Sequence, residues 1–263
     1  MTAVRTYLRE LWVRRSLVRV LAARELKRQY EMNIVGFAWW LLEPLSLTLV
    51  YVVLVQFILR KGTPAYPVFI LSGILPWKWL SASVIGSMSI VRGNSNLITD
   101  VYFPRALLPP VEIVTEFANF AVGLLIVPIF VSIYHVGWSW HLLWLPVIIA
   151  VQFLVVLALA YPLSVWGLYY RNLIGLTQNL LRLWFYLTPI IWSLDLVKKH
   201  IPKFLPIVKL NPATGLVTSY RAVILEHRSP DVTLAYAAAF GVIVLALGSW
   251  YFVRREQQFG KLV

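Results

Sequence analysis

The sequence predicts an all-α integral membrane protein. We expect a single transmembrane domain, residues 1–263, with six transmembrane helices, an N-terminal amphipathic helix at the membrane interface and short re-entrant helices on the outer side. Of the 263 residues, 60% are hydrophobic and only 13% are charged, whereas soluble domains average about 45–50% apolar and about 25% charged residues. Apolar runs of roughly 20 residues, the length that a helix needs to cross a bilayer, also recur along the chain.

The first 35 residues are basic and amphipathic. Eight Arg or Lys residues alternate with Leu, Val and Trp, a pattern typical of a helix that lies in the cytoplasmic headgroup layer. A basic arm that is simply solvated is the alternative interpretation. The eight basic residues are Arg5, Arg9, Arg14, Arg15, Arg19, Arg24, Lys27 and Arg28.

Six apolar segments are expected to cross the membrane, and an even number places both termini on one side. That side is expected to be cytoplasmic, because cytoplasmic flanks collect Lys and Arg and most of the basic flanks fall there. The loop 92–110 lies on the same side, and Pro104, Pro109 and Pro110 are expected to limit helix continuity in it. The six expected spans are 36–59, 68–91, 111–134, 142–168, 173–194 and 234–253.

The segment 195–233 is too polar to cross the membrane once. It holds two short apolar pieces, 204–208 and 213–225, separated by prolines. Pieces of this length indicate re-entrant or interfacial helices on the outer side. The segment also has six Lys or Arg against three Asp or Glu, which departs from the usual excess of positive charge on the cytoplasmic side.

The fifth expected span differs from the others because one of its faces is polar. In residues 169–192, YYRNLIGLTQNLLRLWFYLTPIIW, a set of polar and aromatic residues recurs at spacings of three or four, which places them on one face of a helix. The opposite face carries leucines. The first set is Gln178, Arg182, Phe185, Pro189 and Trp192, and the second is Leu176, Leu180, Leu183 and Leu187.

Arg182 is expected near the middle of the bilayer. A charge there costs at least a few kcal/mol unless it meets a partner or water, which leaves two interpretations open. Arg182 either pairs with a carboxylate inside the bundle, for which Glu43, Glu112 and Glu116 are the candidates, or it lines a polar path. Aromatic residues that lie deep in the spans, among them Tyr51, would stack on sugar rings in such a path.

Several classes of chemistry are excluded. The chain has no cysteine, so thiol chemistry and disulfides are ruled out. There is no phosphate-binding loop or dinucleotide fingerprint, and the four histidines are too scattered for a metal site. We therefore expect no catalytic, metal-binding or cofactor-binding residues in this chain. The net charge of +13 fits membrane flanks better than nucleic acid.

Four stretches of the sequence together resemble one transporter family. In order, they are YEMNIVGFAWWLLEPL, FPRALLP, YYRNLIGLTQNLLRLWFYLTPIIW and LNPATGLVTSYRAVIL. Singly, the shorter ones are weak signals. Together they resemble the transmembrane permease subunit of ABC exporters for lipid-linked polysaccharide, the exporters of O-antigen and wall teichoic acid.

The resemblance implies a homodimer with a channel between the two copies. It also implies a separate cytoplasmic nucleotide-binding subunit, which would bind ATP and Mg and dock on the loop 92–110. The outer segment would act as a gate. On this basis the channel-lining residues are Tyr51, Gln178, Arg182, Phe185 and Trp192, the coupling residues are Asn94, Asp100, Phe103, Pro104 and Arg105, and the gate residues are Lys203, Lys209, Asn211, Pro212 and Arg221.

The resemblance places the chain in the cytoplasmic membrane of a bacterium, exporting a lipid-linked polymer. Positive charge on the outer segment would attract an anionic polymer, which favours wall teichoic acid over O-antigen, although the same charge could simply contact the outer leaflet. Two other functions stay open. One is an ABC permease for drugs or small lipids, and the other is a polyprenyl-linked glycosyltransferase, for which the cytoplasmic loops offer only Asp100 as an acidic residue.

Overall fold

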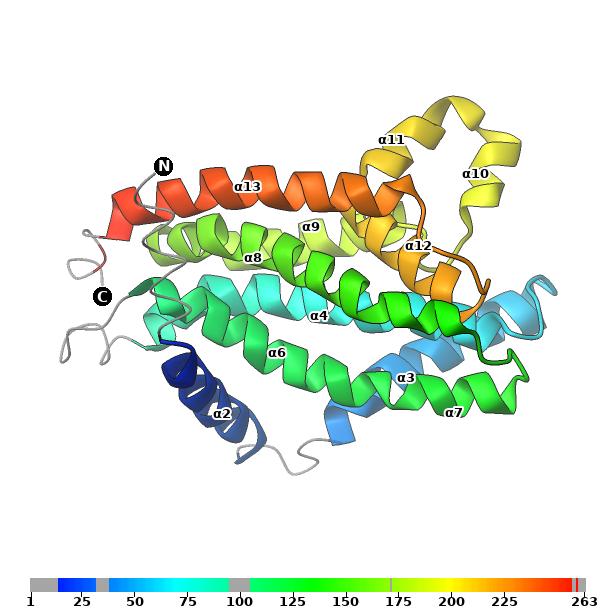
Figure 1. The fold of residues 1–263 in the computed structure, drawn as a ribbon, viewed down its shortest axis with the longest axis horizontal. Helices are drawn as coiled ribbons and strands as arrows, with labels where there is room; N and C mark the ends of the chain where they lie inside the picture. The colour runs from blue at the N-terminus through cyan, green and yellow to red at the C-terminus, as the bar shows by residue number, and fades with distance from the viewer. Residues whose placement is uncertain (1–13, 32–37, 95–104, 171, 257–258, 260–263) are drawn as a thin grey trace.

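The computed structural model describes residues 14–31, 38–94, 105–170, 172–256 and 259. The described residues form helices and turns, and no strand occurs among them. Figure 1 shows the long helices side by side in a bundle, with α2 (Arg15–Glu31) at one end and α10 (Leu194–His200) at the other. We call these the α2 end and the α10 end of the bundle.

Five helical stretches within the described residues are long and apolar enough to cross a membrane. Each of them corresponds to one expected span. They are Trp40–Ile58 in α3 (Ala38–Val52) and η1 (Val53–Ile58), Tyr66–Gly93 in α4, Arg105–Ile133 in η2 (Arg105–Leu107), α6 (Leu108–Leu124) and α7 (Ile126–Ile133), Trp140–Tyr169 in η3 (Trp140–Trp144) and α8 (Leu145–Tyr169), and Val232–Glu256 in α13.

The expected span 173–194 is shorter than predicted. Its helix, α9, runs only over Leu173–Leu187, and fifteen residues rise about 22 Å, less than the roughly 30 Å of a hydrocarbon core. The helix ends because Pro189 restricts Thr188 to extended backbone, with φ −91° and ψ 140°. The prediction of a sixth span therefore rests on α9 together with the turn that follows it.

The expected loop 92–110 also ends earlier than predicted. Pro109 and Pro110 lie in the first turn of α6, which begins at Leu108. Proline is tolerated there because the first amide groups of a helix have no partner inside the helix. The prolines therefore start this helix instead of interrupting it.

The N-terminal helix is confirmed over the residues described. α2 packs against α6 and the residue before it, where Val18 and Ala22 of α2 are buried against Leu107 and Val111. The basic residues Arg19, Arg24, Lys27 and Arg28 are exposed, whereas Gln29 and Tyr30 at the end of α2 form hydrogen bonds with Glu116 and Asn119 of α6. One apolar stripe of α2 thus packs on the bundle, and the exposed surface of the helix is mainly basic, with Val20 as an exposed apolar residue.

The segment between α9 and α13 is folded as short helices, as its length predicted. α10, η4 (Pro202–Phe204) and α11 (Leu205–Leu210) project from the bundle in Figure 1, whereas α12 (Pro212–Ile224) lies within it. α12 packs against α4, α8 and α13, and nearly all of its residues are buried. The segment therefore has an exposed half and a half that belongs to the core.

α4 is the centre of the core. Trp79 is fully buried, and its ring stacks on Phe120 at 4.9 Å and lies 5.2 Å from the ring of Phe117, both from α6. α8 approaches α4 so closely that a Cβ atom added at Gly167 would lie 2.1 Å from the backbone oxygen of Met88. Only glycine permits this crossing of the two helices.

We expect Gly167→Ala to destabilise the protein by roughly 1–3 kcal/mol, the usual cost of overpacking, because the added methyl group meets backbone that cannot rotate away. The matched control is Gly175→Ala in α9, where a Cβ atom meets nothing within 4 Å and alanine favours the helix. Thermal unfolding in detergent should show a lower Tm for the first variant only. Equal Tm values would contradict this account of the crossing.

Candidate functional site

A groove of about 560 Å³ lies between α3, α4 and α9. It brings together four of the five residues expected to line a channel, namely Tyr51, Gln178, Arg182 and Phe185. The groove is also lined by the aromatic residues Trp77 and Tyr186, by the charged residues Glu43 and Lys78, and by Leu47, Ile74, Ser81 and Leu181.

Aromatic rings from all three helices form one wall of the groove. The ring of Phe185 in α9 stacks on Tyr51 of α3 at 6.2 Å, and it meets the edge of Trp77 of α4 at 5.7 Å. Tyr186 packs edge-on against Phe185 at 5.3 Å. Such offset and edge-on pairs are stabilising, and here the ring of Phe185 joins α9 to both α3 and α4. The wall presents flat apolar faces beside the polar groups of the groove.

Lys78 carries a charge that is satisfied within the protein. Its Nζ lies 2.6 Å from Oε2 of Glu43, donates to the backbone oxygen of Trp40 at 3.1 Å, and lies 4.3 Å from the centre of the Trp40 ring. The Lys78 side chain is 13% exposed and that of Glu43 is 49% exposed. The pair therefore ties α4 to α3 and leaves one edge of the carboxylate in the groove.

The carboxylate partner expected for Arg182 is not found. Glu43 pairs with Lys78, Glu116 accepts hydrogen bonds from Gln29 and Asn119, and Glu112 lies at the α2 end beside Glu25 and Arg28. Within the described part of the chain, Arg182 is exposed and has no ion-pair partner within 4 Å. Its guanidinium group therefore contributes positive charge to the groove, which fits the second interpretation of this residue, the polar path.

Trp192 does not lie on the face predicted for it, because α9 ends five residues earlier. Its Nε1 donates to the backbone oxygen of Tyr186 at 3.0 Å, and it does not line the groove. The turn 188–192 is held from outside α9. Tyr66 donates to the backbone oxygen of Ile191 at 3.0 Å, and Arg221 donates to the backbone oxygens of Pro189 and Ile190.

Arg221 is buried, whereas the sequence predicts an exposed charge at the exit of the channel. It is 3% exposed, and besides the two carbonyls of the turn it donates from Nε to the backbone oxygen of Phe69 at 3.2 Å. Its guanidinium carbon lies 3.4 Å from the centre of the Phe69 ring. Arg221 therefore clamps three elements, α12, the turn after α9 and α4. We call this arrangement the Arg221 clamp.

Asn211 and Pro212 begin α12 and also reach α9. The Asn211 side-chain oxygen accepts from the amide of Ala213 at 3.0 Å, which caps the helix, and from Nε1 of Trp184 at 2.8 Å. Its amide nitrogen donates to Oγ1 of Thr188 at 3.1 Å. Of the other expected gate residues, Lys203 is exposed and Lys209 is partly exposed, and both lie in the projecting half of the segment.

The residues expected to couple to an ATPase are only partly described. Asp100, Phe103 and Pro104 lie outside the described residues. Asn94 donates to the backbone oxygen of Ile90 at 2.9 Å at the end of α4, and Arg105 donates to the backbone oxygen of Glu256 at 2.5 Å, which ties η2 to the end of α13. Across the described residues, no three His, Cys, Asp or Glu side chains gather closely enough to hold a metal ion.

The sequence patterns missed two of these contacts. The link between Glu43 and Lys78 joins two helices, and neither residue has an unusual spacing within its own helix. The partners of Arg221 are backbone carbonyls more than thirty residues away in the sequence. Every residue has such a carbonyl, so the sequence does not indicate which ones Arg221 binds. The only signal for the clamp is an arginine inside an otherwise apolar piece of the outer segment.

We expect Glu43→Gln to lower the Tm in detergent, because it leaves the largely buried Lys78 ammonium without its counter-charge. Adding Lys78→Met to that variant should restore part of the loss. Glu31→Gln, which breaks the exposed Lys27–Glu31 pair of α2, should change little and is the matched control. A double variant that is less stable than either single variant would contradict the pairing.

We expect Arg221→Lys to lower the Tm more than Arg228→Lys, although both substitutions conserve charge. One ammonium group cannot reproduce the fork of guanidinium donors, and each buried carbonyl left without a donor costs about 1–3 kcal/mol. Arg228 forms an exposed ion pair with Glu226, where lysine serves nearly as well. Equal Tm values for the two variants would show that the clamp contributes nothing to stability.

The comparisons with known proteins agree on one family. No family model matches the chain. The chain is 36% identical to the O-antigen export system permease protein RfbA of Myxococcus xanthus, over 97% of this chain and 98% of that protein. It is 24% identical to the protein of the same name from Klebsiella pneumoniae, over 94% of this chain and 95% of that protein.

A third relative extends the family to another polymer. The chain is 24% identical to the polysialic acid transport protein KpsM of Escherichia coli, over 93% of this chain and 95% of that protein. These matches cover nearly the full length of each relative, and the five long apolar helices agree with a multi-pass membrane protein. The chain belongs to the family of permease subunits of ABC exporters for polysaccharide.

Proposed function

We propose that this chain is the membrane subunit of an ATP-driven exporter that moves a lipid-linked polysaccharide from the cytoplasmic to the outer side of a bacterial inner membrane. The observation that carries the proposal is the groove between α3, α4 and α9, where aromatic rings lie beside Gln178 and the unpaired Arg182. Aromatic rings stack on the apolar faces of sugar rings without requiring a fixed position along the polymer, and the polar groups bind sugar hydroxyls. The groove therefore tolerates a polysaccharide that slides along it.

The groove becomes a channel when two copies of the chain face each other. α3 and α9, which flank the groove, are packed on one side only, and Leu181 is the one buried residue among those of α9. An exposed Arg182 at this depth is costly against lipid tails and inexpensive against a polar lumen. A homodimer that closes the groove between its subunits satisfies both observations.

We place ATP hydrolysis in a partner subunit that binds ATP and Mg and docks at the α2 end. The chain contains no phosphate-binding loop, and the α2 end carries the basic residues Arg92, Arg105, Arg254 and Arg255. By the positive-inside rule this end is cytoplasmic. The loop 92–110, with Asn94 and Arg105 at its described edges, would transmit the motion of the partner.

For the polymer we propose an O-antigen-type polysaccharide. The basic outer segment favoured teichoic acid on sequence grounds, but Arg221 is buried in the clamp, which reduces the positive charge available at the exit. Two of the relatives are named for O-antigen export, and this supports an O-antigen-type sugar chain. Export of drugs or small lipids remains the competing function.

We expect Phe185→Ala to lower the amount of polysaccharide at the cell surface several-fold and to raise the lipid-linked polymer that accumulates in the cytoplasm, because the aromatic wall loses its central ring. The readout is gel analysis of both pools, with membrane levels of the protein checked by immunoblot. Tyr236→Ala, which removes an exposed ring of α13 away from the groove, should leave both pools unchanged, and Phe185→Trp should retain export.

Three outcomes would contradict the proposed function. Unchanged surface polysaccharide in Phe185→Ala, at normal protein levels, would remove the groove from the transport path. An equal loss of surface polysaccharide in Tyr236→Ala would show that the aromatic residues contribute to the assembly of the protein and not to the transport path. Cells that lack the chain, export polysaccharide normally and become sensitive to drugs would favour the competing function.

A further inference from the structure

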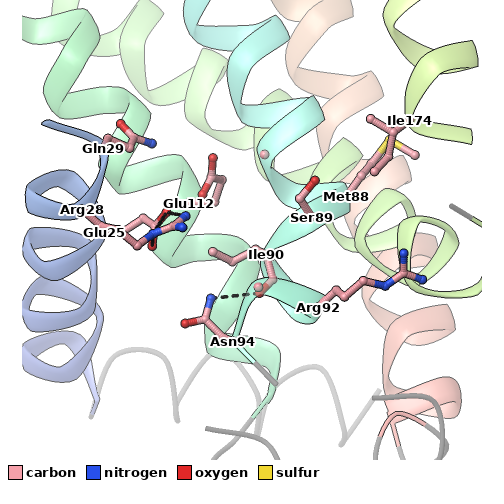
Figure 2. Close-up of a pocket in the computed structure, with 12 residues that line it drawn as sticks. Glu25, Arg28, Gln29, Met88, Ser89, Ile90, Arg92, Asn94, Glu112 and Ile174 are labelled. Carbon is pink, nitrogen blue, oxygen red and sulfur yellow. Dashed lines mark hydrogen bonds and ion pairs between the residues drawn. The ribbon is translucent and has the colours of Figure 1, made fainter. Parts of the chain in front are cut away.

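A second cavity, of about 610 Å³, lies at the α2 end and is separate from the groove (Figure 2). It is bounded by α2, the last turns of α4, the start of α6 and the first turn of α9. Its position at the ends of two candidate spans corresponds to the level of the lipid headgroups. It is lined by Glu25, Arg28, Gln29, Ser89, Arg92, Asn94 and Glu112, by Gly86 and Gly93, and by Met88, Ile90 and Ile174.

The carboxyl group of Glu112 is the unusual feature of this cavity. Glu112 is 5% exposed, and within the described part of the chain it has neither a hydrogen-bond donor nor an ion-pair partner. Gly86 of α4 makes room for it, since a Cβ atom added there would lie 1.6 Å from Oε1 of Glu112. Buried carboxylates are normally paired, so this side chain indicates a missing donor.

The charges around Glu112 do not supply that donor. Its charged neighbours are Glu25, Glu116 and Arg28, but Arg28 already donates to Glu25, with its Nε at 3.1 Å from Oε2. Glu116 accepts from the amides of Gln29 and Asn119, both at 3.2 Å. Glu25 and Glu112 thus share one guanidinium group, with Glu116 as a further carboxylate near Glu112, and this side of the cavity favours a positively charged group.

The other side of the cavity favours a negatively charged group. Figure 2 shows Arg92 across the end of α4 from Glu112, Glu25 and Arg28. One amino group of Arg92 donates to the backbone oxygen of Leu168 at 2.8 Å, and the remaining donors of a guanidinium suit a phosphate. Between the two sides, Ser89 offers a hydroxyl, and Met88, Ile90 and Ile174 offer apolar surface.

We propose that this cavity binds the headgroup of a zwitterionic phospholipid that carries a primary ammonium group, namely phosphatidylethanolamine. Glu112 accepts hydrogen bonds from the ammonium group, Arg92 pairs with the phosphate, and the apolar residues meet the glycerol. The anionic headgroup of phosphatidylglycerol would place no cation beside the carboxylates. A choline headgroup has the same net charge but no N–H to donate. This site does not depend on the polymer that the protein exports.

The test uses the full chain, purified in detergent and stripped of lipid, and follows thermal unfolding as lipid is added. Phosphatidylethanolamine should raise the Tm in a saturable way, and phosphatidylcholine and phosphatidylglycerol with the same acyl chains should raise it much less. Soluble phosphoethanolamine distinguishes a lipid site from a site for the free headgroup. If it stabilises the protein as much as the lipid does, the assignment to a lipid is overturned.

Variants locate the site. Glu112→Gln keeps the shape but removes the charge, and Gly86→Ala fills the space that the carboxyl group occupies. Both should weaken binding of phosphatidylethanolamine roughly tenfold or more, as expected for the loss of a charged hydrogen bond. Glu31→Gln, an exposed acid of the same helix as Glu25, should not. Native mass spectrometry of the lipid adducts provides an independent measure of occupancy.

Two results would overturn the proposal. One is an equal Tm response of the wild-type chain to the three phospholipids, which decides the matter even when neither variant folds. The other is unchanged binding of phosphatidylethanolamine in a folded Glu112→Gln variant, which would show that the carboxyl group meets no ammonium. Neither result bears on the role of the groove, because the groove variants measure a different face of the molecule.

Discussion

A bilayer offers no water to a buried charge, and this constraint organises the polar residues of the bundle. Lys78 meets Glu43, Arg221 meets three backbone carbonyls, and Glu116 meets two amides. In each case at least one partner comes from another element of the fold, so satisfying the charge also fixes the packing. Among the described residues, the charged side chains of Arg182 and Glu112 lack such a partner. Each of them faces a cavity.

The long helices were predictable because membrane spans leave a strong signal. Five expected spans match helices within a few residues, and α2 appears where basic and apolar residues alternate. The errors came from proline. Pro109 and Pro110 are compatible with the first turn of α6 and were assigned to a loop, whereas Pro189 ends α9 and was assigned to its face. Proline has both effects, and only its position within the helix decides between them.

The residues of the site that share a face of one helix were predictable, whereas the contacts between different helices were not. Gln178, Arg182 and Phe185 share a face of α9, so their spacing placed them together in the groove. The prediction for Trp192 was wrong because α9 ends before this residue. The pairing of Glu43 with Lys78, the Arg221 clamp and the isolation of Glu112 arise from the crossing of helices far apart in the sequence, and no spacing rule contains that information.

The contacts of Asn211 have a mechanical consequence for the α10 end of the bundle. One side chain caps α12 and also holds Trp184 of α9 and Thr188 directly after it, and the Arg221 clamp adds a connection between α12 and the turn that follows α9. α9 and α12 are thereby fastened into one rigid body. Any opening at this end has to hinge within residues 193–210, where α10 and α11 stand apart from the bundle.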